Sequence, residues 1–200
     1  MALLTNKRSL IVAAHCDDVE LSCGGTLLAT PARRAYALVL VGGKCKHRRR
    51  ICEANLENLG VVAVYMDQPD CAVPVSAATV ARIEEAIDEA GAEVVITHAS
   101  DDTHQDHRAV RAMVETAMRR RPVSLIEMDS PSVTPSWKPN AWQPVDAELK
   151  EGLLAPYRPH VGEDVIRWWA CPDAVAAVRG VPACERFRII QWWVKREEMP

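Results

Sequence analysis

Apolar and polar residues follow two different periods along the first two thirds of the chain. Short runs rich in β-branched residues are separated by longer stretches in which apolar side chains recur at three- and four-residue steps. This alternation is typical of α/β proteins, in which helices connect the strands of a mostly parallel sheet. The pattern predicts a sheet of about five strands, at residues 10–14, 37–41, 61–66, 94–97 and 124–128.

Helices are predicted between these strands, and the third of them shows the pattern well. Val80, Ile83 and Ile87 recur at helical spacing, Ser76 can cap the first turn, and Gly91 can end the helix. The helical stretches lie near residues 24–30, 48–59, 77–90 and 104–120.

Residues 131–200 differ in character from the rest of the chain. All six tryptophans and nine of the thirteen prolines lie there. The clear elements in this part are helices at residues 146–154 and near 173–178 and a strand at 187–193. We therefore expect a single domain over residues 1–200, in which helices flank the sheet of residues 1–130 and a loop-rich C-terminal cap at 131–200 does not fold alone.

The composition argues against several classes of partner. With 24 basic and 27 acidic side chains, the net charge of −3 gives no general attraction to nucleic acid or to an anionic membrane. No apolar run approaches the roughly 20 residues of a membrane span, and the first residues lack the pattern of a signal peptide. The seven cysteines are odd in number and irregularly spaced, which favours reduced thiols and a cytoplasmic protein.

Histidines and carboxylates collect directly after two of the predicted strands. The first strand continues into His15, Cys16, Asp17 and Asp18, and the fourth is followed by the run HASDDTHQDH, which ends in His107. Adjacent carboxylates at the end of a buried strand cost stability unless a cation, a proton or hydrogen bonds compensate. Because ligands of open α/β sheets bind beyond the carboxyl ends of the strands, these two loops can form one site.

Two imidazoles and one carboxylate make an open metal site that leaves a position for water. We assign His15, Asp18 and His107 as ligands of Zn²⁺, and Fe²⁺ or another divalent cation suits the same set. Asp17 lies next to a ligand and is the expected general base, with His104 as its catalytic partner.

Three features near these residues have more than one interpretation. Asp106 lies between two histidines and can act in catalysis by orienting one of the rings, although the sequence does not say which. His98 is an alternative ligand, but its place at the end of a strand favours a packed or hydrogen-bonded imidazole. Gly24 and Gly25 serve either helix packing or a close approach of the backbone to a ligand.

The two loops resemble motifs of a known family. The stretches AHCDDVELSCGGTL and VVITHASDDTHQDHRAV are similar to the hallmarks A-H-P-D-D-E-x-x-x-x-G-G-T and H-P-D-H of the PIG-L/LmbE-like superfamily of zinc-dependent N-acetylglucosaminide de-N-acetylases. The segments ENLGVVAVYMDQPD and WKPNAWQPVDAELKEGLLAPYRPH extend the resemblance over most of the chain. Two positions depart from the motif, because Cys16 replaces the proline and Val19 replaces the glutamate, with Glu20 one position on.

The resemblance implies a Rossmann-like sheet and the hydrolysis of an N-acetyl group from an amino sugar. At the positions that match the motifs, it implies His15, Asp18 and His107 as metal ligands. It also implies Asp17 as the general base and His104 as the acid or oxyanion partner. These roles agree with the assignment from the chemistry of the residues.

Residues outside the motifs are candidates for substrate binding. Arg48 lies in the basic run KCKHRRR and can bind an anionic part of the substrate, although a solvated helix start is the alternative. Asp70 resembles a family position that contacts sugar hydroxyls, and a turn aspartate is the alternative. The tryptophans can stack on sugars, fill the core or contact a second copy of the chain, so a homo-oligomer remains open.

The predicted function is the metal-dependent removal of an N-acetyl or other N-acyl group from a small-molecule amino sugar in a specialised biosynthetic pathway, such as that of an antibiotic. Neither nucleic acid nor a membrane is an expected partner. Two alternatives remain. One is an amidase or phosphoesterase that uses the same metal on an anionic, non-sugar substrate, and the other is a non-catalytic, metal-binding descendant of the enzyme.

Overall fold

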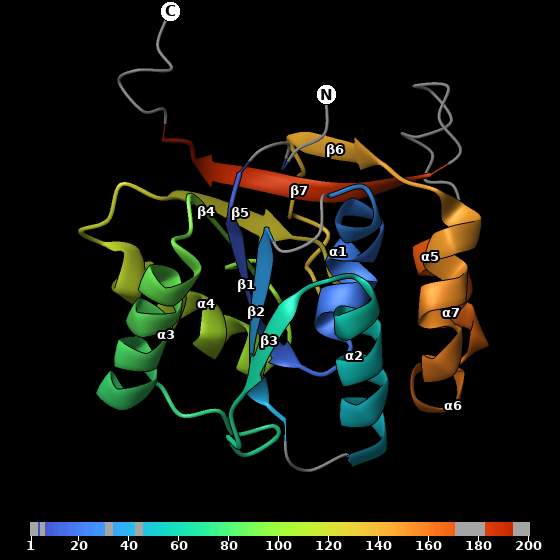
Figure 1. The fold of residues 1–200 in the computed structure, drawn as a ribbon, viewed down its shortest axis with the longest axis horizontal. Helices are drawn as coiled ribbons and strands as arrows, with labels where there is room; N and C mark the ends of the chain where they lie inside the picture. The colour runs from blue at the N-terminus through green and yellow to red at the C-terminus, as the bar shows by residue number, and fades with distance from the viewer. Residues whose placement is uncertain (1–3, 5–6, 31–33, 43–45, 171–182, 194–200) are drawn as a thin grey trace, which may run out of the picture.

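The computed structural model describes residue 4 and residues 7–30, 34–42, 46–170 and 183–193. These residues form one sheet with helices on both faces (Figure 1). The strands are β1 (Ser9–His15), β2 (Ala35–Val41), β3 (Val62–Tyr65), β4 (Val94–Thr97), β5 (Ser124–Met128), β6 (Ala141–Pro144) and β7 (Cys184–Gln191). The α-helices are α1 (Asp18–Leu28), α2 (Lys46–Asn58), α3 (Ala77–Ala90), α4 (Gln105–Met118), α5 (Ala147–Leu154), α6 (Arg158–Val161) and α7 (Glu163–Ala170), with a 3₁₀ turn at Ala155–Tyr157.

The sheet has the order β3-β2-β1-β4-β5-β7-β6. Strands β1 to β5 pair in parallel, whereas β7 pairs antiparallel with both β5 and β6. The predicted mostly parallel α/β fold is confirmed, and the described sheet has two more strands than the five expected from residues 1–130. The additional strands come from the C-terminal part, where β6 was missed because its sequence AWQP carries no β-branched residue.

Two apolar layers enclose the sheet, which explains why every residue of β1 is buried. Figure 1 shows α3 and α4 on one face and α1 and α2 on the other. On the first face Ile83 of α3 and Met113 of α4 pack with strand residues, and on the second face Val19 of α1 and Leu56 of α2 do so. Among the described residues, the helices are too short or too polar to cross a bilayer.

Helix α1 begins at Asp18, earlier than the predicted start near Gly24. Acidic residues in its first turn, Asp18 and Glu20, favour a helix start, and the glycines lie inside the helix. A Cβ atom on Gly24 would lie 2.7 Å from Leu153 Cδ2, and one on Gly25 would lie 2.5 Å from Val145 Cγ1. The two glycines therefore permit close packing of α1 against the C-terminal part of the chain.

A buried carboxylate joins the C-terminal part to α1. The two carboxylate oxygens of Glu185, on β7, accept hydrogen bonds from the backbone amides of Gly25 and Thr26, each at 2.8 Å. Lys150 Nζ of α5 lies 2.7 Å from the same carboxylate. Strands β6 and β7 thus extend the sheet, and Glu185 binds α1, which is more than the covering role expected for a cap.

Other expectations for this part had mixed outcomes. The predicted helix at 146–154 is α5, and the predicted strand at 187–193 is β7, which begins three residues earlier at Cys184. The predicted helix near 173–178 lies outside the described residues. Trp137 is buried, whereas Trp192 and Trp193 are both exposed.

Candidate active site

Both histidine-containing loops lie at one edge of the sheet, at the point where the strand order reverses. From β1 the chain continues to β2 on one side, and β4 pairs with β1 on the other. In open α/β sheets this position is where ligands bind. His15 ends β1, Asp18 begins α1, and His107 lies in the first turn of α4, so the fold brings together residues about 90 positions apart.

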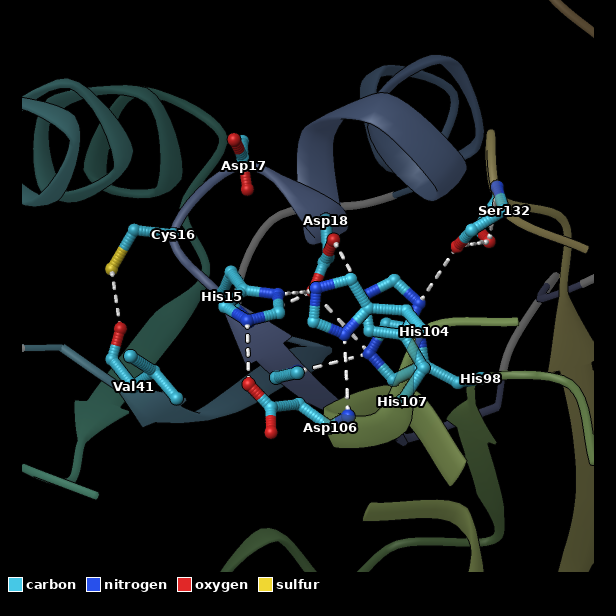
Figure 2. A network of polar contacts seen from close by, with 12 residues as sticks. His15, Cys16, Asp17, Asp18, Val41, His98, His104, Asp106, His107 and Ser132 are labelled. Carbon is cyan, nitrogen blue, oxygen red and sulfur yellow. Dashed lines mark hydrogen bonds and ion pairs between the residues drawn. The ribbon is translucent and has the colours of Figure 1, made fainter. Parts of the chain in front are cut away.

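Two carboxylates contact the ring of His15. Its Nδ1 lies 3.3 Å from Asp18 Oδ2, and its Nε2 lies 3.2 Å from Asp106 Oδ2 (Figure 2). Asp106 is itself fixed, because its oxygens accept hydrogen bonds from the backbone amides of Cys71 at 2.7 Å and Val73 at 3.0 Å. The ring that Asp106 orients is therefore that of His15, which the sequence could not reveal because it lies on another strand.

His107 is held in the same way from the opposite side. Its Nδ1 lies 2.9 Å from Asp102 Oδ2, and its Nε2 lies 3.5 Å from Asp18 Oδ1. The hydroxyl of Ser130 donates to the same Asp102 oxygen at 2.5 Å. A carboxylate on one ring nitrogen fixes the orientation of an imidazole and leaves the other nitrogen for a metal. For both rings, the nitrogen that is left faces Asp18.

The carboxylate of Asp18 lies at the centre of these contacts. It accepts a hydrogen bond from the backbone amide of His15 at 2.8 Å, and it is almost entirely buried. Ligand atoms of His15, Asp18 and His107 all lie within 4.8 Å of one another, a spacing that one cation can bridge after small adjustments. These three residues, which the sequence proposed as ligands, are thus brought together.

The electrostatics of this cluster suit a divalent cation. Burial lowers the pKa of His15, but the hydrogen bond and charge of Asp18 outweigh it and raise the pKa to about 9. The same balance, with Asp102 contributing, raises the pKa of His107 to about 10. Although burial disfavours its charge, the charge and hydrogen bond of His107 hold the pKa of Asp18 well below its usual value. Without a metal, the cluster therefore binds two protons around its carboxylates, and a dication would replace them.

Three other groups of side chains have comparable spacing. They are His15, His104 and Asp106; His98, Asp102 and His107; and Asp70, Cys71 and Asp106. Asp106 accepts two backbone hydrogen bonds, and Asp102 holds the Nδ1 atom of His107. Their oxygens are therefore less available to an ion than those of Asp18, and we regard the group around Asp18 as the best candidate metal site.

Asp17, in the first of the two motifs, contacts Arg48 of helix α2. It occupies the position before α1 and is 4% exposed, and Arg48 Nη1 donates to its Oδ2 at 3.1 Å. Burial and the neighbouring charge of Asp18 raise the pKa of Asp17 to about 6, against the opposing effect of Arg48. A carboxylate with a pKa in this range can both accept and release a proton near neutral pH. Arg48 is placed at the site by its contact with this proposed base.

His104 is at the N-cap position of α4, beside the rings of His15 and His107. Its Nδ1 accepts a hydrogen bond from the backbone amide of Asp106 at 3.2 Å, so the neutral ring carries its proton on Nε2. Burial and the charges of His107 and His15 lower its pKa, which favours this neutral form. His104 can therefore act as a hydrogen-bond donor at neutral pH.

Asp70 lies at the rim of the site, after β3. Its Oδ1 is 3.6 Å from His15 Nε2, and its side chain is 25% exposed. Its carboxylate is therefore close to His15 and accessible to a molecule bound at the site. Within the basic run, Arg49 lies over the ring of Tyr65, and Lys44 and Cys45 are outside the described residues.

The residues that depart from the family motif point away from the candidate metal site. Cys16 is buried, and its thiol donates to the carbonyl of Val41 at 3.7 Å. Glu20 is buried on α1, where it accepts a hydrogen bond from the hydroxyl of Tyr157 at 2.6 Å. Val19 packs in the apolar layer between α1 and the sheet. The replacements therefore change packing around the site more than its donor atoms.

Comparison with known proteins gives one match to a family and several to structures. The model of the PIG-L family, described as GlcNAc-PI de-N-acetylase, matches residues 10–118. Among curated protein sequences, none matches this chain significantly.

Solved structures share the fold at low sequence identity. N,N'-diacetylchitobiose deacetylase from Pyrococcus horikoshii has a TM-score of 0.71 and 16% identity, over 93% of this chain and 85% of that chain. The A40926 pseudoaglycone deacetylase Dbv21 has a TM-score of 0.71 and 17% identity, over 94% and 99% of the two chains. GalB, the 4-carboxy-2-hydroxymuconate hydratase from Pseudomonas putida KT2440, has a TM-score of 0.72 and 16% identity, over 94% and 98%.

Identities this low show a common fold and not a common activity. The family match is stronger, because residues 10–118 make up more than half of the 200-residue chain and include both histidine-carboxylate motifs. This chain therefore belongs to the PIG-L family of GlcNAc-PI de-N-acetylases.

Proposed function

We propose that this protein is a metal-dependent hydrolase that removes an acetyl or related acyl group from the nitrogen of an amino sugar. The observation that carries the proposal is the arrangement of His15, Asp18 and His107, whose ligand atoms lie within 4.8 Å of one another. Asp17 directly precedes Asp18 in the chain. Family membership supports this function. Two proteins with the same fold are deacetylases, of diacetylchitobiose and of the A40926 pseudoaglycone, which supports an amino-sugar substrate. A deacetylase of the teicoplanin biosynthetic pathway also has this fold, which supports a role in such a pathway.

Zn²⁺ is the first candidate for the metal, because two imidazole nitrogens and a carboxylate form a set of donors that it prefers, and Fe²⁺ can use the same set. When bound there, such a cation would polarise the carbonyl of the substrate amide and make water a stronger nucleophile. The outer carboxylates Asp102 and Asp106 would keep the rings of His107 and His15 in the orientation for binding.

In the proposed mechanism, Asp17 transfers protons and His104 stabilises the charge on the carbonyl oxygen. The Asp17 carboxylate takes a proton from the attacking water, and once protonated it can give that proton to the leaving nitrogen. The Nε2–H group of His104 donates a hydrogen bond to the carbonyl oxygen as negative charge develops on it. The products are acetate and a free amine.

Arg48 and Asp70 are the proposed substrate contacts. Asp70 would accept hydrogen bonds from sugar hydroxyls at the rim. Arg48 is close enough to Asp17 to donate to it, and its remaining guanidinium hydrogens can bind an anionic substituent of the sugar. For a substrate without the anionic substituent, we therefore expect a larger increase in KM than decrease in kcat.

The proposal is tested by measuring acetate release from a panel of N-acetylated amino sugars. We expect activity that disappears with a chelator and returns with Zn²⁺ or Fe²⁺. The variant Asp17→Asn should lower kcat by about 10²–10⁴-fold while the metal content is unchanged. Asp67→Asn is the matched control, because Asp67 is exposed and contacts Arg49 at 3.6 Å outside the site. Acetate release that survives both the chelator and Asp17→Asn would contradict the mechanism.

The same panel separates the alternative functions. Phosphate esters and non-sugar amides test for a phosphoesterase or amidase, and an unsaturated carboxylic acid tests for hydration, because GalB shows that this fold also occurs in a hydratase. A protein that binds Zn²⁺ stoichiometrically without turning over any of these compounds would be the non-catalytic descendant.

A further inference from the structure

His98 contacts His107 and Asp18 of the candidate metal site but is not one of the proposed ligands. It follows β4 directly and has no exposed surface. Its ring stacks on that of His107, with 3.7 Å between the ring centroids and 12° between the planes. Its Nε2 lies 3.3 Å from Asp18 Oδ2 (Figure 2).

The same ring nitrogen also binds the backbone of β1. The amide of Ala14 donates a hydrogen bond to His98 Nε2 at 2.9 Å, and Ala14 immediately precedes His15. Because this nitrogen accepts a hydrogen bond, its lone pair is directed at the Ala14 amide and is unavailable to a metal. His98 is therefore a poor ligand, even though its atoms lie within 4.8 Å of those of Asp102 and His107.

A histidine at this position has an energetic cost. When Nε2 accepts, the proton of the neutral ring is on Nδ1, and that buried atom has no hydrogen-bond partner among the described residues. An unsatisfied buried donor destabilises the folded state, and a phenylalanine of similar shape would not have this donor. The imidazole must therefore contribute an interaction that an apolar ring cannot. Nε2 lies near both the Ala14 amide, at 2.9 Å, and Asp18 Oδ2, at 3.3 Å. We assign the hydrogen bond to the closer Ala14 amide, which can only donate, so that Nε2 is its acceptor.

We infer that His98 is a positioning residue, which fixes the end of β1 relative to the ring of His107 and so pre-organises the metal site. The Ala14 hydrogen bond holds the backbone that carries His15, and the stacked ring limits the rotation of His107. Both ligands are thus fixed against each other by one side chain. This inference rests on the proposed function only in assuming that the site binds a divalent cation.

The test compares the affinity of the full-length chain for Zn²⁺, measured by competition with a chromophoric chelator. His98→Phe keeps a stacking ring but leaves the Ala14 amide without an acceptor, and it should lower the affinity about 10–100-fold. His98→Gln places an amide oxygen where Nε2 was and should recover part of the loss, whereas His98→Asn is too short and should not. The visible absorption of the Co²⁺-loaded variants gives a second measurement, because it reports the coordination geometry.

Thr97→Val is the matched control. The hydroxyl of Thr97 donates to the carbonyl of Val12 at 2.9 Å, which is another buried hydrogen bond between β4 and β1. Its loss should lower the free energy of unfolding but leave the Zn²⁺ affinity within about two-fold of the wild type.

Two results would overturn the inference. One is wild-type affinity in His98→Phe, and the other is an equal loss in Thr97→Val, which would indicate general loosening of the two strands. If His98→Phe does not fold, the Zn²⁺ affinities of His98→Gln and His98→Asn are compared instead. Equal affinities in these two variants would overturn the inference. A wild-type chain that binds Zn²⁺ but releases no acetate would contradict the proposed function and leave the role of His98 intact.

Discussion

The Nδ1 atom of His104 accepts a hydrogen bond from the amide of Asp106, so the proton of the neutral ring is on Nε2. Among the described residues, Nε2 has no hydrogen-bond partner, and its N–H group can donate to a substrate. We expect His104→Ala to lower kcat about 10²–10³-fold with little change in metal content. His104→Gln should recover part of this loss, because an amide N–H can donate at a similar reach. His160→Gln, on exposed α6, is the control. If His104→Gln is no more active than His104→Ala, donation by Nε2–H is not the role of this residue.

The burial of Glu20 predicts that the stability of the metal-free protein depends on pH. Burial raises its pKa from 4.5 to about 7, against the hydrogen bonds from Tyr157 and Asn55 that lower it. The folded state therefore binds this proton more tightly than the unfolded chain, so the contribution of Glu20 is present below pH 4.5 and is lost as the pH rises through 7. The loss is roughly 3 kcal/mol in the free energy of unfolding.

The substitution Glu20→Gln removes this titration while keeping a side chain of the same shape. Urea unfolding at several pH values between 4.5 and 7.5 should show a smaller decline of stability in the variant than in the wild type. Parallel declines in the two proteins would mean that another group causes the pH dependence.

At the scale of residues, the sequence was informative where chemistry and position in a strand coincide. His15, Asp18 and His107 are titratable groups directly after strands or at a helix start, and the structure brings them together. The supporting residues were harder to predict. Asp102 was visible in the run of the second motif but had no assigned partner, and Ser130 gave no signal, because its contact with Asp102 depends on the path of the chain after β5.

At the scale of elements, the close packing of α1 predicts that a larger residue at Gly25 destabilises the fold. Alanine is favoured over glycine inside a helix by about 1 kcal/mol, but a Cβ atom on Gly25 would lie 2.5 Å from Val145 Cγ1. We expect Gly25→Ala to lower the free energy of unfolding by about 1–3 kcal/mol, because the overpacking exceeds the gain in propensity.

Gly152 provides the matched control on α5, because a Cβ atom there has no neighbour within 4 Å. Gly152→Ala should raise the free energy of unfolding by up to about 1 kcal/mol. Chemical denaturation of both variants checks the pair, and a stabilised Gly25→Ala would show that α1 can move away from Val145.

Elements with strong periodicity were predictable, and those shaped by tertiary contacts were not. Helix α3 has the predicted bounds, with Ser76 accepting from the amide of Thr79 at its start and Gly91 in a left-handed conformation at its end. The predicted start of α1 was wrong, because two adjacent glycines, Gly24 and Gly25, are typical of a helix boundary in the sequence alone. The two glycines are needed because α1 packs closely against Leu153 and Val145 of the C-terminal part. A local sequence pattern does not reveal such distant neighbours.

The sheet as a whole predicts that residues 1–130 do not fold alone. Without the C-terminal part, β5 loses its antiparallel partner β7, and α1 loses the Glu185 carboxylate that binds its amides. A chain ending at residue 130 should therefore lack a cooperative unfolding transition, while one ending at residue 193 should keep it. Thermal unfolding followed by circular dichroism compares the two, and a cooperative transition in the shorter chain would contradict this expectation.

At this largest scale the sequence predicted the mostly parallel sheet and placed the two histidine-containing loops at the carboxyl ends of its strands, because βαβ units follow general rules of connection. It predicted neither the order of the strands nor that β6 and β7 enter the sheet. The antiparallel pairing of β7 with both β5 and β6 depends on contacts between residues far apart in the chain, and the prolines and tryptophans of this part obscure its strand pattern.

The contact between Glu185 and α1 also has a consequence for synthesis on the ribosome. The helix that supplies Asp18 is synthesised well before the carboxylate that binds it, because Gly25 and Glu185 are 160 residues apart in the chain. The nascent chain therefore cannot complete the packing behind the candidate metal-binding loop until Glu185 has left the exit tunnel. Binding of a metal at the proposed site should accordingly follow the synthesis of Glu185.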